Sequence, residues 1–298
     1  MVGLRDQEVI SRYRLSRPMI NDLVHLIRAD IDPKTNRGMG IDAETKRSAR
    51  DATVVKVLLT LRYLAKGDFF SEVGDIHGVS KSSMSRHLHD VVLAINNRVD
   101  NIRFPEIDVE RRSTATPFYR LSRIPRVLGA IDCTLISITT PTSHEASYVC
   151  RKGYHALNVQ AVVDTKLRFI DAVARWPGAT NDATIFEMSG LKDYLEANAV
   201  GVLLGDSGNA LRNYLLTPIL RPTANAQVAY NDAHARGRVV VERAFGMLKS
   251  RFRSLKVVME VNISSSLTVT SLLADPCNSL DQRELRRDLQ MAVLAATL

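Results

Sequence analysis

Residues 127–132, Val-Leu-Gly-Ala-Ile-Asp, form an apolar run that ends on a carboxylate. Residues 201–206, Gly-Val-Leu-Leu-Gly-Asp, repeat this pattern further along the chain. Short apolar runs bounded by turn residues are typical of buried β-strands. Taken alone, Asp132 and Asp206 would each be ordinary turn residues, because Asp is common in turns. Their shared position at the end of a strand makes them candidates for one common site.

A third carboxylate, Glu242, lies in a helical pattern that extends from about residue 231 to residue 255. The apolar residues of this pattern recur at helical spacing: Val241, Phe245, Leu248, Phe252 and Leu255. Glu242 lies beside this stripe, and a carboxylate near an apolar face is costly unless it is paired or metal-bound. We therefore rank a ligand role for Glu242 above the alternative of a surface residue.

Carboxylates at the ends of two strands and on a following helix can hold a pair of divalent cations. Mg²⁺ prefers oxygen ligands and often joins carboxylates to substrate phosphates. Two such ions about 4 Å apart stabilise both the attacking and the leaving oxygen of a phosphodiester. Asp132, Asp206 and Glu242 are therefore predicted to be catalytic and to bind Mg²⁺ or Mn²⁺, with no need for a side-chain general base.

The surrounding elements predict an α/β domain over residues 127–262. Strand-like runs cover 127–138, 156–165 and 168–176, and an amphipathic helix follows over 182–197. With the strand that ends at Asp206 and the later helix, the order is β-β-β-α-β-α, which resembles an RNase H-like fold. Asn181 or Asp182 can cap the helix, and Asp182 can also bind metal, since the two roles are compatible.

Residues 1–110 predict an all-α region. A short helix near 70–77, the turn 78–80 and a longer helix after Ser80 form a helix-turn-helix pattern. The second helix presents polar and basic residues at its N-terminal end, which usually meets DNA bases: Lys81, Ser82, Ser85, Arg86 and His89. Such three-helix units also occur as plain scaffolds, and the positive charge tilts the interpretation toward DNA. Residues 111–126, with two prolines and paired arginines, are interpreted as a linker.

The composition favours a polyanionic partner. The 298 residues carry a formal net charge of +8, with a pI near 9.5. Three scattered cysteines, Cys133, Cys150 and Cys277, match neither a disulfide framework nor a zinc site. No apolar run is long enough for a membrane span, and the N-terminus has no apolar signal core. We therefore expect a soluble intracellular protein that does not bind a membrane.

Five short segments resemble the PIF/Harbinger transposases and the nucleases derived from them, which belong to the DDE endonuclease superfamily. In chain order these segments are Gly129–Thr134, Arg151–Asn158, Trp176–Asp182, Gly205–Gly208 and Val241–Phe245. Each segment alone has little specificity, but five in order at matching separations are highly specific. The resemblance extends from about residue 12 to about residue 257.

The resemblance implies a metal-binding set of four residues: Asp132, Asp182, Asp206 and Glu242. It also makes Arg151 and Lys152, otherwise a solvated hairpin tip, candidate contacts to the phosphates of double-stranded DNA. Family members that transpose act with a Myb/SANT-type DNA-binding protein that helps to bring them to the nucleus. The resemblance thus implies such a partner and a nuclear location, with the cytoplasm as a second compartment.

Residues 263–298 depart from the family pattern. Family members usually end with a Cys-rich run and a Leu-His-Asn element, but residues 264–268 are Ser-Ser-Ser-Leu-Thr and no Leu-His-Asn follows. We expect this tail to be the weakest part of the fold, with exposed apolar surface that favours a homo-oligomer. An active transposase or nuclease and a domesticated, non-catalytic DNA-binding protein both stay open, since the carboxylates favour the first and the tail favours the second. RNA is a less suitable substrate, because the deep major groove of A-form RNA is hard to read.

Overall fold

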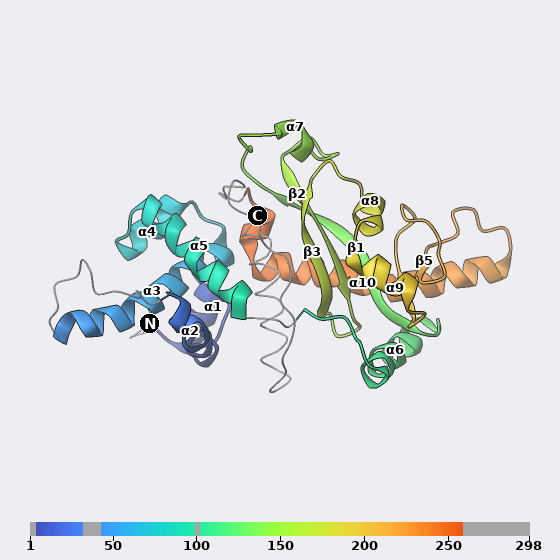
Figure 1. Cartoon of the computed structure of the whole chain (residues 1–298), viewed down its shortest axis with the longest axis horizontal. Helices are drawn as coiled ribbons and strands as arrows, with labels where there is room; N and C mark the ends of the chain where they lie inside the picture. Colours follow the sequence, from blue (N-terminus) through green and yellow to red (C-terminus); the bar gives the residue numbers. More distant parts are fainter. Residues whose placement is uncertain (1–3, 32–42, 99–101, 259–298) are drawn as a thin grey trace. The chain divides into compact units, whose positions relative to one another are not determined.

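The computed structural model describes residues 4–31, 43–98 and 102–258. The chain forms two compact units, both drawn in Figure 1. The first unit contains the residues up to Asp100 and a segment that begins at Lys249. The second unit contains the stretch from Asn101 to Leu248. The tail 263–298, expected to be the weakest part of the fold, lies outside the described residues.

The first unit is built from helices whose apolar residues recur at helical spacing. Its elements are α1 (Asp6–Tyr13), α2 (Arg17–Ile31), α3 (Ala43–Lys66), α4 (Phe70–His77), α5 (Lys81–Arg98) and the 3-10 helix η1 (Arg253–Lys256). Helix α3 packs against α5, α2 and η1. It ends at Gly67, whose φ of 69° is left-handed. A Cβ at Gly67 would lie 2.5 Å from Val257 Cγ2 and 3.0 Å from Ser254 Cα, so the close approach of η1 and of the residue after it also requires a glycine there.

The chain turns between α4 and α5 at residues 78–80. Gly78 adopts the left-handed conformation with φ 70°, which ends α4. The hydroxyl of Ser80 accepts a hydrogen bond from the backbone N–H of Ser83 at 3.2 Å and so caps α5. The two helices and their turn have the boundaries that the sequence predicted.

The second unit is a mixed α/β fold around a five-stranded sheet of order β3-β2-β1-β4-β5. Strands β1 (Val127–Ser137), β2 (Ala156–Val163) and β3 (Phe169–Pro177) are antiparallel neighbours. Strands β4 (Val202–Leu204) and β5 (Leu215–Leu216) run parallel to β1. The helices are α6 (Asp108–Ser122), α7 (Glu145–Tyr148), α8 (Asp182–Glu187), α9 (Gly190–Ala197) and α10 (Asn225–Arg251), which continues into the first unit. Among the described residues, none of the helices is both long and apolar enough to cross a membrane.

Different helices cover the two faces of the sheet, because successive side chains of a strand point to opposite faces. Leu203 of β4 lies in a core with residues of α8 and α9: Phe186, Leu191 and Leu195. Its neighbour Leu204 faces α10 at Gly237, where a Cβ would lie only 2.3 Å from Leu204 Cδ1. The absence of a side chain at Gly237 lets this helix approach the strand closely. The same alternation of side chains between the two faces determines to which face of the sheet the residues after β4 point.

Residues 111–126, interpreted from the sequence as a linker, are mostly helical, because α6 extends to Ser122 and packs against β1. Pro117 lies inside this helix and removes one backbone hydrogen bond, which is why the sequence pattern pointed away from a helix. Phe118 and Ser122 are fully buried. Burial of this face offsets the missing bond.

The single helix expected over 182–197 is two helices, α8 and α9, separated at Met188-Ser189. The hydroxyl of Ser189 accepts a hydrogen bond from the backbone N–H of Lys192 at 3.1 Å. Ser189 therefore begins a new helix as its N-cap. The amphipathic stripe continues across the break, since Phe186 of α8 and Leu191 of α9 are buried in the same core.

Candidate metal centre

The register of two parallel strands brings Asp132 and Asp206 together. Ala130 of β1 pairs with Leu204 of β4. Asp132 lies two residues after Ala130, and Asp206 lies two residues after Leu204. Each aspartate therefore points to the same face of the sheet as the residue two positions before it. The two apolar runs that end on a carboxylate thus form adjacent strands.

Asp182 reaches the same place from the N-terminus of α8. The N-cap of that helix is Asn181, whose Oδ1 accepts from the backbone N–H of Thr184 at 2.8 Å. Asp182 is therefore not needed as the cap. Asn158 of β2 donates from Nδ2 to Asp182 Oδ1 at 2.8 Å and to the carbonyl of Thr180 at 2.9 Å. These two bonds fix the carboxylate of Asp182 relative to the sheet.

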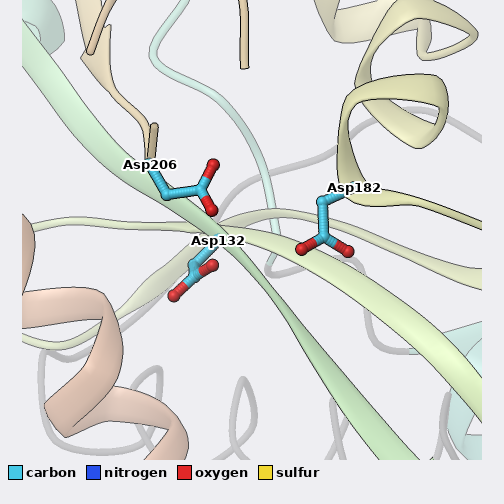
Figure 2. Close-up of side chains that lie close together, drawn as sticks. All are labelled: Asp132, Asp182 and Asp206. Carbon is cyan, nitrogen blue, oxygen red and sulfur yellow. The ribbon is translucent and has the colours of Figure 1, made fainter. Parts of the chain in front are cut away.

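Asp132, Asp182 and Asp206 form an acidic centre. Each offers one carboxylate oxygen, and these three oxygens all lie within 4.8 Å of one another. Figure 2 shows the three side chains converging from separate elements of the fold. Carboxylate oxygens are the ligands that Mg²⁺ and Mn²⁺ prefer. The donor set therefore fits the divalent cation that the sequence predicts.

Both carboxylate oxygens of Asp132 have a hydrogen-bond partner. Its Oδ1 accepts from the backbone N–H of Cys133 at 2.9 Å, and its Oδ2 accepts from Arg238 Nη2 at 2.7 Å. Burial raises the pKa of Asp132 above its usual value, and the charges of Asp206 and Asp182 raise it further. Arg238 and the bond from Cys133 act in the opposite direction. A cation at this point would favour the ionised form.

A tight turn orients Asp206. Its Oδ1 accepts from the backbone N–H of Gly208 at 3.1 Å and from Asn209 Nδ2 at 2.7 Å. The strand before it is held by Leu216 of β5, whose carbonyl accepts from the backbone N–H of Gly205 at 2.9 Å. Asp206 is thus fixed from both sides of the turn.

Glu242 does not join the three aspartates among the described residues. It lies on α10 with 52% of its side chain exposed and forms an ion pair with Arg238, one helical turn earlier. The sequence had indicated that Glu242 points along the buried edge of α10. Arg238 instead forms ion pairs with both Glu242 and Asp132, so within the described part of the chain Glu242 contacts the centre only through Arg238.

The residues predicted to contact DNA are exposed. Lys81, Ser82, Ser85, Arg86 and His89 lie on the solvent side of α5 in the first unit. Arg151 and Lys152 lie on a turn before β2 in the second unit, which is closed by a 2.9 Å hydrogen bond from the Gly153 N–H to the Cys150 carbonyl. Their contact with DNA remains a prediction.

Three residues that support the centre were given no role there by sequence reasoning: Asn158, His234 and Arg238. His234 is buried, and its Nε2 donates to the carbonyl of Leu216 at 3.0 Å. Burial lowers the pKa of His234, so the ring is neutral near pH 7. One signal was present in the sequence: residues four apart on a helix share a face, which places His234, Arg238 and Glu242 in one row.

Comparison with known proteins identifies the family of the domain that contains these aspartates. Residues 131–274 match a family described as DDE superfamily endonuclease. The human protein HARBI1 is 35% identical over 253 residues, which cover 84% of this chain and 70% of that protein. The Arabidopsis thaliana protein ALP1-like is 28% identical over 268 residues, covering 84% of this chain and 64% of that protein. No solved structure matches the chain.

The strand-end carboxylates and the matched family define the chain as one with a DDE superfamily endonuclease domain. With HARBI1 as a relative over most of both chains, it belongs to the family of the PIF/Harbinger transposases and the nucleases derived from them. The resemblance stated from the five sequence segments is confirmed.

Proposed function

We propose that this protein is a DNA endonuclease that depends on Mg²⁺ or Mn²⁺ and cleaves phosphodiester bonds at the centre formed by Asp132, Asp182 and Asp206. The observation that carries this proposal is the convergence of three carboxylate oxygens within 4.8 Å, in the domain that matches DDE endonucleases. Together with Glu242, these residues supply a hard-oxygen set suited to two divalent cations.

Each residue has a part in this mechanism. Bound divalent cations would activate a water molecule and stabilise the leaving 3′ oxygen. Asp132 and Asp206 hold the site at the ends of adjacent strands, and Asp182 closes it from α8. Glu242 completes the DDE set of an RNase H-like nuclease. Asn158 keeps the Asp182 carboxylate turned toward the sheet.

We propose that the first unit binds double-stranded DNA through the helix-turn-helix formed by α4, the turn at 78–80 and α5. The exposed cations Lys81 and Arg86 lie near the N-terminal end of α5, where Ser82, Ser85 and His89 are also exposed. In the second unit, Arg151 and Lys152 offer two further charges for phosphates. From the resemblance alone, we add a Myb/SANT-type partner and a nuclear location to this proposal. The departure of residues 263–298 from the family pattern adds assembly as a homo-oligomer.

A cleavage assay tests the proposal. Nicking of duplex DNA should require Mg²⁺ or Mn²⁺ and stop in EDTA. Asp132→Asn, Asp182→Asn and Asp206→Asn should each reduce the rate by about a thousandfold or more, and double variants should be little worse, because the ligands act as a unit. Asp193→Asn is the matched control, since Asp193 is a 77% exposed side chain of α9 in the same unit. Full cleavage by the Asp206→Asn protein would refute the site.

A second candidate is a domesticated DNA-binding protein without nuclease activity. The observation that favours it is the position of Glu242, which is half exposed and paired with Arg238 rather than gathered with the aspartates. The same assay separates the two candidates. A non-catalytic protein would bind duplex DNA and show no metal-dependent nicking in any variant.

A further inference from the structure

Arg238 holds two of the acidic residues at once. Its Nη2 lies 2.7 Å from Asp132 Oδ2, and its Nη1 donates to Glu242 Oε1. Its side chain is only 22% exposed, and that of Asp132 is 17% exposed. The planar guanidinium suits this role, because its donors form a rigid fork that can contact two carboxylates. The contact therefore joins a strand-end aspartate to the glutamate of α10.

The same carboxylate serves two purposes that conflict. Asp132 Oδ2 accepts from Arg238, and Asp132 is also one of the three carboxylates that can hold a divalent cation. A guanidinium and a divalent cation at one carboxylate repel each other, because like charges at short range in a half-buried site are weakly screened. Loading the centre with metal thus has to weaken the Arg238–Asp132 contact.

We infer that Arg238 is a positioning residue that stands in for the metal: it holds Asp132 and Glu242 together in the metal-free protein and yields Asp132 when a divalent cation binds. This inference rests on the proposed metal-dependent function. Release of the guanidinium also frees Glu242, which lies one helical turn from Arg238 on the same face of α10. The ion pair accounts for a DDE glutamate that lies apart from its aspartates.

Metal affinity of the full-length protein tests the exchange. The Arg238→Gln variant removes the competing cation, so it should bind Mn²⁺ tighter than the wild type by about tenfold in calorimetric titration at pH 8, a change of about 1.4 kcal/mol. Arg243→Gln is the matched control, because Arg243 is an exposed arginine on the same helix and its loss changes the net charge equally. Its Mn²⁺ affinity should stay within about twofold of wild type, a difference below about 0.5 kcal/mol.

Thermal unfolding provides a second readout that does not depend on catalysis. In EDTA, Arg238→Gln should melt below the wild type, because the aspartates lose their counter-charge. Saturating Mn²⁺ should then raise its Tm by more than it raises that of the wild type, since a ligand that binds more tightly stabilises the folded state more at the same concentration. A purely structural role for Arg238 would lower Tm without strengthening Mn²⁺ binding.

The outcomes separate this inference from the proposed function. If the wild type binds Mn²⁺ and Arg238→Gln binds it equally or more weakly, the exchange is wrong and the metal centre stands. If the wild type does not bind Mn²⁺, or if the Asp206→Asn protein binds Mn²⁺ as tightly as the wild type, the proposed metal centre is wrong. The proposed exchange is then wrong as well. Tighter binding by Arg238→Gln, with Arg243→Gln unchanged, supports both.

Discussion

Replacing Asp171 with asparagine should stabilise the second unit, and more so at high pH. Asp171 lies on β3 opposite Val162, whose side chain belongs to the core beneath α8 and α9. Its Oδ2 is shielded from solvent and has no hydrogen-bond partner among the described residues. Burial raises the pKa of Asp171 from its usual 3.8 to about 6. Between pH 3.8 and about 6, the folded protein therefore keeps a proton on Asp171 that the unfolded chain releases.

The sign and size of the effect follow from this shift. The contribution of Asp171 to stability is fully present below pH 3.8 and is lost as the pH rises through about 6. At pH 8 the buried charge costs about 3 kcal/mol, and at pH 5 about 1.5 kcal/mol. Asparagine has nearly the same shape and no charge, so the advantage of Asp171→Asn over the wild type should grow by about 1.5 kcal/mol between these pH values.

Urea denaturation followed by tryptophan fluorescence measures this difference. The chain has one tryptophan, Trp176, and it lies on β3 with Asp171, so the signal reports on this unit. At pH 8 the midpoint of Asp171→Asn should exceed that of wild type by between about 1 and 3 M urea. The exposed Asp193→Asn variant is the control and should show no pH-dependent gain. An Asp171→Asn advantage that is equal at pH 5 and pH 8 would refute the reasoning.

Two further predictions follow from the DNA-binding proposal and from the packing of α10. Replacing both Lys81 and Arg86 with alanine should reduce the slope of log K against log salt for duplex binding by about two units, one for each lost phosphate contact. An unchanged slope would show that DNA binds to another surface of the protein. Gly237→Ala puts a Cβ 2.3 Å from Leu204 Cδ1. This overpacking should lower the free energy of unfolding by about 1–3 kcal/mol, which urea denaturation measures. Gly246→Ala is the control, because a Cβ at Gly246 meets nothing within 4 Å.

The two strand-end aspartates could be predicted because their signal is local. An apolar run that ends on Asp predicts a buried strand with a polar end, and two such runs were candidates for one common site. The register that aligns Asp132 with Asp206 follows from the pairing of Ala130 with Leu204. Asp182 was an open choice between capping and metal binding. The structure resolves the capping part, because Asn181 takes that role.

The surroundings of Glu242 could not be predicted, because they depend on how α10 is rotated against the sheet. The apolar stripe fixes that rotation only within one or two residues. The buried residues Val241 and Phe245 turn Glu242 toward the edge of the helix, where half of its side chain meets solvent. Arg238 then lies between Glu242 and Asp132. The residues of α10 and β1 lie far apart in the sequence, so a contact between them cannot be predicted from a local pattern of residues. Helix α6 was missed for a similar reason, since burial against β1 outweighs the effect of Pro117.

The charge balance of the acidic centre favours a bound cation. Two unit charges 4.8 Å apart repel by about 3.5 kcal/mol at an effective dielectric constant of about 20. Three ionised aspartates at such distances would repel by about 10 kcal/mol in total, which is comparable to the whole stability of a domain. The protein reduces this repulsion by the Arg238 ion pair and by a raised pKa at Asp132. One arginine cannot balance three carboxylates, so the centre is left with a net negative charge. A divalent cation removes that deficit, which favours metal binding over a purely structural role for the cluster.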